Sequence, residues 1–183
     1  MSDSEESSLI FVEATIADLP EVRALVESAY RGDSSRRGWT TEADYLDGQR
    51  TDVDALQEII NHPMQCILLA REGSELVASV HLKLDLPSAM LGMFAVTPTL
   101  QGGGIGRRTV VQAESWALNQ GASLMRMYVI SLRASLIAWY QRLGYSLTSQ
   151  SAPFPYGDAR FGVPKRDDLM FVVMQKRLPR VLT

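Results

Sequence analysis

The residues of this sequence with the clearest chemical use are the glycines at positions 102, 103, 104 and 106. They follow an apolar run at residues 90–96 and precede a segment with helical spacing. At such a junction the first N–H groups of the helix have no partner and lie at the positive end of its dipole. Glycines let an anionic ligand approach that backbone, so the stretch predicts a phosphate-binding loop.

Two common phosphate-binding fingerprints do not fit this loop. A P-loop needs lysine and then serine or threonine after its last glycine, whereas Arg107 and Arg108 follow Gly106. The dinucleotide pattern G-x-G-x-x-G, started at Gly102, would place its third glycine at Arg107. The acidic residue expected about 20 positions later is also missing. The sequence therefore indicates a different phosphate ligand.

A third pattern fits at every fixed position. Residues 96–106, Val-Thr-Pro-Thr-Leu-Gln-Gly-Gly-Gly-Ile-Gly, resemble the diphosphate loop V-x-P-x-x-[R/Q]-G-x-G-[I/L]-G of the GNAT superfamily of acetyltransferases. The order of the predicted elements also resembles that family over residues 9–177. The resemblance implies that acetyl-CoA is the co-substrate.

A second family signature, N-x-x-A-x-x-[L/F]-Y-x-x-x-G-[F/Y], is similar to residues 133–145. The second half fits, from Tyr140 through Gly144 to Tyr145, whereas Arg133 replaces the asparagine and Leu136 replaces the alanine. The pantetheine contact usually made by that asparagine is therefore not implied here. Arg133 has the charge to reach a phosphate instead.

The resemblance also implies how acetyl-CoA is held. Its diphosphate would lie on the loop residues Gln101, Gly102, Gly103, Gly104, Ile105, Gly106 and Arg107. The backbone of Phe94, Ala95 and Val96 would pair with the pantetheine arm, and the same side chains would also pack in the core.

The reaction that the resemblance implies is direct attack of a neutral amine on the thioester, without an acyl-enzyme. Backbone N–H groups near residues 94–96 would polarise the carbonyl, and Tyr140 would protonate the departing thiolate. Tyr140 also lies on an apolar helical stripe, so core packing is its alternative role. Several groups are candidates for the general base: Glu42, Asp44, His81, Asp85 or a water relay.

The polar residues 31–52 fall where this family builds one wall of its acceptor site, and residues 154–165 would form the opposite wall. Trp39 and Tyr45 would pack on the acceptor, and Glu42, with Asp44 or Asp47 as alternatives, would attract its ammonium group. The arginines at 31, 36 and 37 suit an acceptor that also bears a carboxylate or phosphate. We expect a small-molecule amine, with a protein or peptide amine, or an inactive acyl-CoA-binding sensor, as alternatives.

The elements that must position these residues follow from apolar spacing. Strands are predicted at residues 9–14, 65–70, 76–86, 90–96, 124–130, 145–149 and 169–176. Helices are predicted to begin near residues 19, 53, 106 and 132. In strand 76–86 the even-numbered residues are apolar, which predicts one buried face. The order predicts an α/β (α+β) fold with a mixed sheet of about seven strands and four flanking helices. The resemblance adds a splay between the fourth and fifth strands.

Length and composition exclude several classes of protein. With 183 residues and 46% hydrophobic residues, we expect a single domain at 9–183 after a flexible acidic N-terminus at 1–8. A net charge of −3 argues against nucleic acid as a partner.

One cysteine, Cys66, and two histidines make a metal site improbable, and Cys66 lies in an apolar strand, which predicts a buried thiol. The polar start and the lack of an 18-residue apolar window predict a cytoplasmic protein without a membrane partner. In the family a homodimer is common, although no residue here marks an interface.

Overall fold

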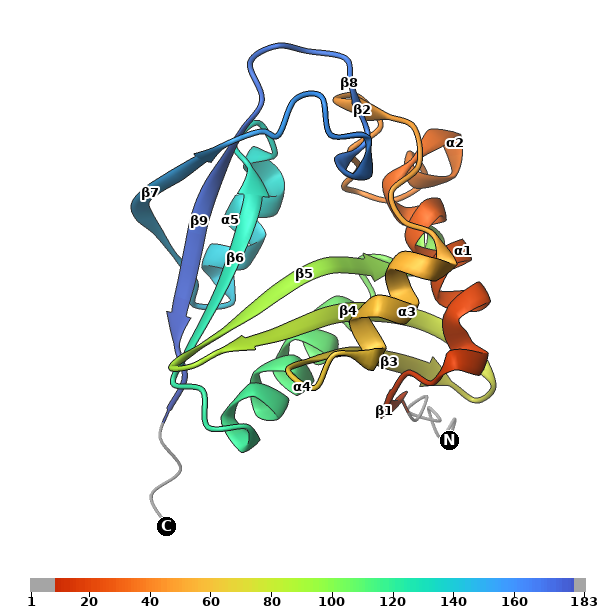
Figure 1. Ribbon diagram of the computed structural model, residues 1–183, viewed down its shortest axis with the longest axis vertical. Coiled ribbons are helices and arrows are strands. Elements are labelled where there is room, and N and C mark those ends of the chain that lie inside the picture. Colours follow the sequence, from red (N-terminus) through yellow and green to blue (C-terminus); the bar gives the residue numbers. More distant parts are fainter. Residues whose placement is uncertain (1–8, 180–183) are drawn as a thin grey trace, which may run out of the picture.

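A computed structural model describes residues 9–179, so the predicted flexible N-terminus at 1–8 lies outside the described residues. A seven-stranded sheet forms the centre of the molecule (Figure 1), in the order β1 (Leu9–Glu13), β3 (Gln65–Glu72), β4 (Glu75–Asp85), β5 (Ser88–Val96), β6 (Leu124–Ile130), β9 (Met170–Arg177) and β7 (Ser146–Pro153). Strands β5 and β6 pair in parallel and all other neighbours are antiparallel. The predicted mixed sheet is confirmed.

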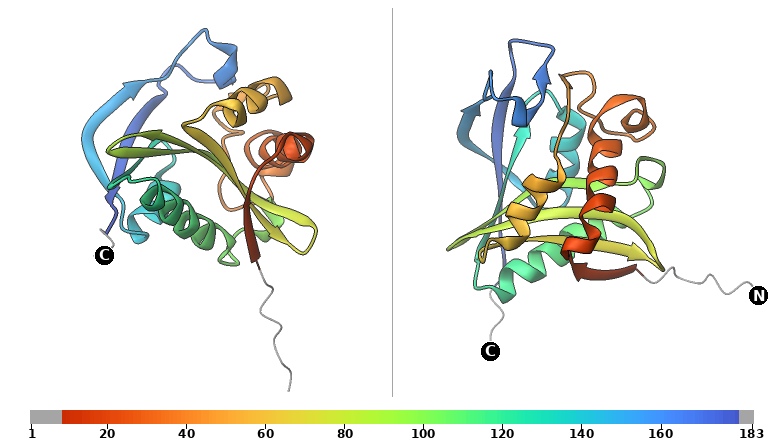
Figure 2. Two further views of the ribbon diagram at one scale, coloured as in Figure 1. Left: turned by 60° about the horizontal axis from the view of Figure 1, so that its bottom comes forward. Right: turned by 45° about the vertical axis from the view of Figure 1, so that its right-hand side comes forward.

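Four helices cover the two faces of this sheet (Figure 2). Helices α1 (Leu19–Tyr30) and α3 (Val53–Asn61) pack on one face, and α4 (Ile105–Asn119) and α5 (Ala134–Arg142) pack on the other. The remaining short elements lie in loops: α2 (Gly32–Ser35), β2 (Leu46–Asp47), β8 (Val163–Pro164) and three single turns at Ile16–Asp18, Pro98–Leu100 and Ala159–Phe161. The four predicted helices are confirmed, and the short elements were too brief to show a period.

Strand β4 corrects the prediction of a single buried face. Val80 and Leu82 pack with α4, but Leu76 packs with α1 on the opposite face. The pairing of β3 with β4 shifts between Ala70 and Arg71, and one extra residue reverses the alternation of side chains. Val77 is buried as well, because helices cover both faces at this end of the strand. Leu86 lies exposed beyond the strand.

A second bulge lies in β5. Val80 of β4 lies opposite two residues of β5, Met93 and Phe94. Met93 has a φ of 44°, in the left-handed region that residues other than glycine rarely adopt. After this bulge, Met93 packs with the α1 cluster, and Phe94 packs with residues on the α4 side. The bulge therefore reverses the alternation of side chains, because Leu91 before it packs on the α4 side whereas Ala95 after it packs on the α1 side.

Strands β5 and β6 pair over a short length only. Three residue pairs join them: Ser88 with Leu124, Ala89 with Met125 and Met90 with Arg126. Beyond Met90 the two strands diverge, whereas β5 continues to pair with β4 as far as Val96. The predicted splay between the fourth and fifth predicted strands is confirmed (Figure 1).

The two long loops meet across this splay. Strand β2, within residues 31–52, pairs with β8, within residues 154–168. Leu46 is buried beside this contact in a cluster with Ile130 and Phe154. The small sheet therefore connects the two sides of the molecule above the point where the central strands separate (Figure 1).

The single cysteine, the helices and the possible metal ligands can be compared with the predictions from composition. Cys66 is buried in β3 as predicted, and burial raises the pKa of its thiol to about 12. Within residues 9–179, no helix has the length and apolar character needed to cross a membrane. In the same range, no three His, Cys, Asp or Glu side chains are grouped as a metal site would require.

The loop that carries β8 contains two left-handed glycines whose surroundings differ. Gly162 has a φ of 96°, and a Cβ there would lie 2.8 Å from Nη2 of Arg31 and 2.9 Å from the Asp47 carbonyl oxygen. Gly157 has a φ of 87°, but a Cβ there would meet nothing within 4 Å. Gly162 also has a ψ of 178°, a combination that essentially only glycine adopts, so crowding and backbone strain act together there.

We predict that Gly157→Ala lowers the free energy of unfolding by about 1 kcal/mol, the cost of a left-handed alanine. Gly162→Ala should cost roughly 2 kcal/mol more, because alanine is strained at its φ and ψ and a backbone oxygen of β2 must also move. Urea unfolding of both variants measures the difference. Equal losses would show that the contact between the two loops contributes nothing to stability.

Candidate active site

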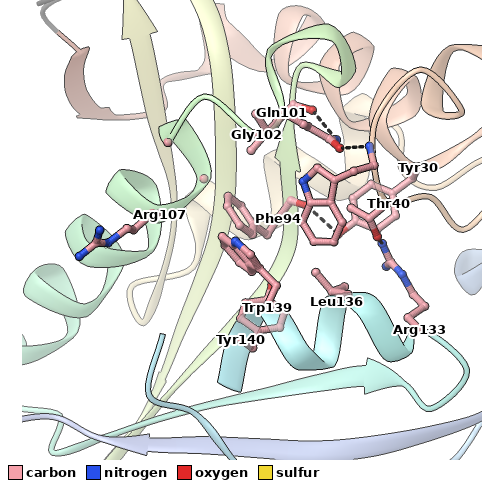
Figure 3. A pocket seen from close by; sticks show the side chains of 14 residues that line it. Tyr30, Thr40, Phe94, Gln101, Gly102, Arg107, Arg133, Leu136, Trp139 and Tyr140 are labelled. Atoms are coloured by element: carbon pink, nitrogen blue, oxygen red, sulfur yellow. Dashed lines mark hydrogen bonds between the residues drawn. The ribbon is translucent and has the colours of Figure 1, made fainter. Parts of the chain in front are cut away.

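A cavity of about 260 Å³ lies between the start of α4, helix α5 and the loop after α1 (Figure 3). We call it the glycine-loop cavity. Its lining consists of Tyr30, Trp39, Thr40, Phe94, Val96, Gln101, Gly102, Gly104, Gly106, Arg107, Arg133, Leu136, Trp139 and Tyr140. The structure therefore brings most of the predicted cofactor-binding residues to one place. Gly103 and Ile105 belong to the same loop, and Ala95 is buried against the α1 side.

The glycine loop has free backbone donors. In the described part of the chain, the N–H groups of Gly102, Gly103 and Gly104 donate to no acceptor. The N–H groups of the first residues of α4, from Ile105, have no intrahelical partner. Gly102 and Gly104 have φ values of 88° and 89°, and a Cβ at either would point into open space. The loop thus has the donors and the room that a diphosphate needs.

Gln101 fixes the neighbouring loop over this cavity. Its side-chain oxygen accepts from the Trp39 N–H at 3.0 Å, and its amide nitrogen donates to the Val96 carbonyl at 3.3 Å. A Cβ at Gly38 would collide with the same side chain, so a larger residue there would displace the Gln101 amide from these bonds. The Trp39 ring consequently lies 6.0 Å from the ring of Trp139. This tie holds Trp39, which was predicted for the acceptor wall, in the lining of the glycine-loop cavity.

Tyr45, the other aromatic residue predicted for the acceptor wall, packs within the protein. Its hydroxyl donates to the Leu132 carbonyl at 3.4 Å, and its ring packs on the buried cluster around Leu46. It lines neither this cavity nor the one described next. Tyr45 therefore joins the β2 loop to the segment before α5.

A second cavity, of about 660 Å³, lies on the α1 side of the sheet where β5 and β6 have separated. We call it the strand cavity. Its volume is that of a small-molecule site. Gly92 forms part of its floor, and a Cβ added there would meet nothing within 4 Å. Charged side chains from both halves of the protein line it: Glu42, Arg50, Lys83, Asp85, Arg126 and Arg133.

The two cavities share one wall. Five residues line both: Tyr30, Phe94, Arg133, Leu136 and Tyr140. The Tyr30 hydroxyl donates to the Phe94 carbonyl at 2.9 Å, which joins α1 to the bulged part of β5 (Figure 3). The glycine-loop cavity and the strand cavity therefore meet at the splay, from opposite faces of the sheet.

Tyr140 lies in that shared wall, on α5. It is 4% exposed, and its ring lies 5.0 Å from that of Trp139. Burial, with a smaller contribution from Tyr30, raises the pKa of the Tyr140 hydroxyl above its usual value. At neutral pH this hydroxyl therefore keeps its proton and can donate it. The core and site roles foreseen for Tyr140 are compatible.

Glu42 is held between two arginines. One carboxylate oxygen lies 3.0 Å from Nη1 of Arg31 and the other lies 3.0 Å from Nη1 of Arg133. Arg133 also donates to Oγ1 of Thr40 at 2.7 Å (Figure 3). The exposed fractions of the Arg31, Glu42 and Arg133 side chains are 8%, 11% and 10%. An ammonium group at Glu42, or a phosphate at Arg133, would have to replace one of these buried ion pairs.

Sequence reasoning missed the cations that face the strand cavity. The arginines at 31, 36 and 37 are not among its lining residues, and Arg36 instead pairs with Asp44 at 2.6 Å on the surface. Arg50, Lys83 and Arg126 line the cavity in their place. The signal for Arg126 was a charged residue inside an otherwise apolar strand.

His81 faces the strand cavity from β4, and its Nε2 lies 2.7 Å from Oε1 of Gln65. Burial, with smaller contributions from the nearby positive charges of Arg50 and Lys83, lowers the pKa of His81 from 6.5 to about 4. The imidazole is therefore uncharged at neutral pH. Of the other candidate bases, Asp85 lines the cavity and Asp44 does not.

Comparison with known proteins agrees with this geometry. A model of the acetyltransferase (GNAT) family matches residues 21–145. No curated protein matches the sequence significantly.

Solved structures of similar fold include ribosomal-protein-S18-alanine N-acetyltransferase from Escherichia coli, with a TM-score of 0.70 and 14% identity, over 95% of this chain and 96% of that chain. Another is yncA, a putative acetyltransferase from Salmonella typhimurium with its cofactor acetyl-CoA, with a TM-score of 0.68 and 18% identity, over 97% and 98%. A third is a spermidine N-acetyltransferase chimera from Vibrio cholerae and hSSAT, with a TM-score of 0.68 and 15% identity, over 94% and 96%. At these identities the likeness shows the fold alone.

The lowered pKa of His81 predicts a pH dependence of stability. Between pH 6.5 and pH 4 the His81 imidazole is protonated in the unfolded chain but not in the folded protein. The stability that is present above pH 6.5 is therefore lost as the pH falls. The loss should reach about 3 kcal/mol at most, and His81→Gln should remove it. Urea unfolding at pH 7 and pH 4.5 measures both proteins. An equal loss in the variant would contradict the burial of a neutral imidazole.

Proposed function

Since the chain belongs to the GNAT family and is an acetyl-CoA-dependent N-acetyltransferase, we propose that it acetylates the primary amine of a small molecule. The observation that supports this most directly is the meeting of two cavities at Tyr140. In the proposal, the donor enters through the glycine-loop cavity and the acceptor through the strand cavity. The two reactants then approach each other from opposite faces of the sheet.

The glycine-loop cavity fits acetyl-CoA, whose thioester supplies the activated acetyl group. The free N–H groups of residues 102–107 would hold the diphosphate. Arg107 lies at the outer edge of this cavity, on α4, and would add charge there (Figure 3). The aromatic rings of Trp39, Phe94 and Trp139 would exclude water from the arm that extends toward the splay.

In the proposed reaction the amine nitrogen forms a bond to the thioester carbonyl carbon, and the carbon–sulfur bond then breaks. Backbone N–H groups near Phe94, where the bulge interrupts the pairing with β4, polarise the carbonyl as negative charge grows on its oxygen. Tyr140 donates its proton to the departing thiolate and is reprotonated from water. The products are the N-acetylated amine and free CoA.

The amine must also lose a proton. His81 lies in the strand cavity, but with a pKa of about 4 its imidazole cannot retain a proton taken from an amine at neutral pH. We therefore assign the transfer to water in the strand cavity, which leads the proton to solvent. In this proposal His81 positions that water, either by accepting a hydrogen bond from it or by donating one to it.

The rim of the strand cavity supports a small acceptor over a protein chain. Residues 31–52 and 154–168 both contribute to the lining, and the β2–β8 pairing joins them across the splay. Lys165 reinforces this rim, because its Nζ lies 3.1 Å from Asp47 and donates to the Ala43 carbonyl at 2.9 Å. A joined rim suits a compact amine better than a polypeptide segment.

Tyr140→Phe tests the catalytic part of the proposal. Without the hydroxyl proton, kcat for acetyl transfer should fall by roughly a hundredfold or more, whereas the Kd for CoA should stay within about twofold. Thiol release from acetyl-CoA over a panel of amines, with calorimetry for CoA, measures both. Undiminished kcat would remove Tyr140 from the mechanism. CoA binding by the wild type without turnover of any amine would instead favour the sensor.

Gly104→Ala and Gly121→Ala test the cradle as a matched pair. Both glycines have a φ of 89° and no atom within 4 Å of an added Cβ, but Gly121 follows the opposite end of α4. Each alanine should cost about 1 kcal/mol of stability. Only Gly104→Ala should raise the Kd for CoA, by roughly tenfold or more, because its methyl group points toward the diphosphate. Equal affinities would place the diphosphate elsewhere.

A further inference from the structure

The strand cavity has an excess of unpaired positive charge. Arg50, Lys83 and Arg126 form no ion pair within residues 9–179. The lining carboxylates are Glu42, which both Arg31 and Arg133 neutralise, and Asp85. His81 adds no further positive charge at neutral pH, because its imidazole is uncharged there. Three free cations thus face one free carboxylate.

The sheet register places two of these cations in one row. Lys83 of β4 pairs with Met90 of β5, which pairs in turn with Arg126 of β6. Paired residues in adjacent strands point to the same face, so Lys83 and Arg126 flank the Met90 side chain on the cavity side. Arg126 contacts the Gln150 side-chain oxygen, and its Nε is buried without a partner in the described chain. This end of the cavity is therefore an incompletely satisfied anion site.

Arg50 approaches from the other side. Its guanidinium carbon lies 5.1 Å from the centre of the Tyr30 ring, and the Tyr30 hydroxyl is bonded to Phe94. Its backbone N–H is fixed by Oε1 of Glu27 at 2.7 Å. Arg50 thus lies near the splay, whereas Lys83 and Arg126 lie where β5 and β6 are still paired. An anionic ligand would be met by positive charge along the length of the cavity.

The rest of the lining is apolar. Tyr128 and Phe171 pack edge to face with ring centres 6.2 Å apart, and Phe161 from the long loop contributes a third ring. Tyr128 and Phe161 are 50% and 40% exposed, although both belong to this cavity. Exposed aromatic rings beside unpaired cations suit a ligand with an apolar body and an anionic group.

We propose that the acceptor is an amine that carries a carboxylate on an apolar body, and that Lys83 and Arg126 bind the carboxylate. This inference rests on the proposed function of the strand cavity as the acceptor site. A polyamine is disfavoured, because its charges would face like charges in the lining. The amine end would lie at the shared wall beside Tyr140, and the carboxylate would lie toward the paired ends of β5 and β6.

Matched acceptors test the proposal. The acceptors are phenylalanine and phenylalanylalanine, each as the free acid and as the C-terminal amide. Acid and amide of one compound differ only in the negative charge, and the two compounds test two distances between the amine and the carboxylate. The N-acetylated forms are measured by calorimetry with CoA present, and the free amines by thiol release from acetyl-CoA. At least one acid should bind roughly tenfold to a hundredfold more tightly than its amide. High salt should reduce the difference.

Variants of the strand cavity show which residues cause the preference for the acid. Lys83→Gln combined with Arg126→Gln should abolish the preference for the acid by weakening acid binding alone, and Arg126→Lys should retain part of it. Gly92→Leu, whose side chain would fill the cavity floor, should abolish binding of acid and amide while CoA still binds. Arg23→Gln, an exposed arginine of α1 that lines neither cavity, controls for loss of surface charge.

With the wild-type protein, the proposal would be overturned by equal binding of acids and amides, by preference for amides or for spermidine, or by absence of binding by all probes. Unchanged acid binding in Gly92→Leu would also overturn it, by placing the acids outside the strand cavity. Selective acid binding with no acetyl transfer to any probe would count against the proposed function and leave the anion site standing.

Discussion

The early end of hydrogen bonding between β5 and β6 is the constraint on which the rest of this structure depends. Three residue pairs join the strands, and after Met90 each strand follows its own half of the protein. Where the strands separate, backbone and side chains that a neighbouring strand would otherwise cover are accessible from both faces of the sheet. The bulge at Met93 directs Phe94 toward the glycine loop and leaves Gly92 on the opposite side. A local failure of strand pairing therefore creates the meeting point of two cavities.

A sheet that opens in this way must be held together elsewhere, and a buried charge cluster does so. Glu42 in the loop after α1 bonds to Arg31 beside it and to Arg133 at the start of α5, in the other half of the sheet. Buried ion pairs gain little over apolar packing, but removing one partner leaves an uncompensated charge that is costly. Such a cluster favours one relative placement of the two halves. The β2–β8 pairing and Tyr45 add contacts across the same gap.

The sequence was informative wherever structure depends on near neighbours. Helix spacing, the apolar strands and the glycine loop after Val96 were sufficient to predict the fold, the family and the loop with free donors. The bulges at Val77 and Met93 were not predictable, because pairing between distant strands imposes them and neither residue type marks them. The place of Trp39 could not be predicted either, because it depends on Gln101, 62 residues away in sequence. The cations of the strand cavity come from a loop and two strands, and only the register of the sheet brings Lys83 and Arg126 together.

The aromatic side of the glycine-loop cavity has a practical consequence. Of the three tryptophans in the sequence, Trp39 and Trp139 line this cavity with their rings 6.0 Å apart, and Trp116 lies outside it, donating to Glu13 at 2.8 Å. Indole fluorescence is sensitive to polarity and to stacking with a neighbouring ring. The protein therefore contains its own optical reporter, in which two of three emitters sense the occupancy of one cavity and the third provides an internal reference.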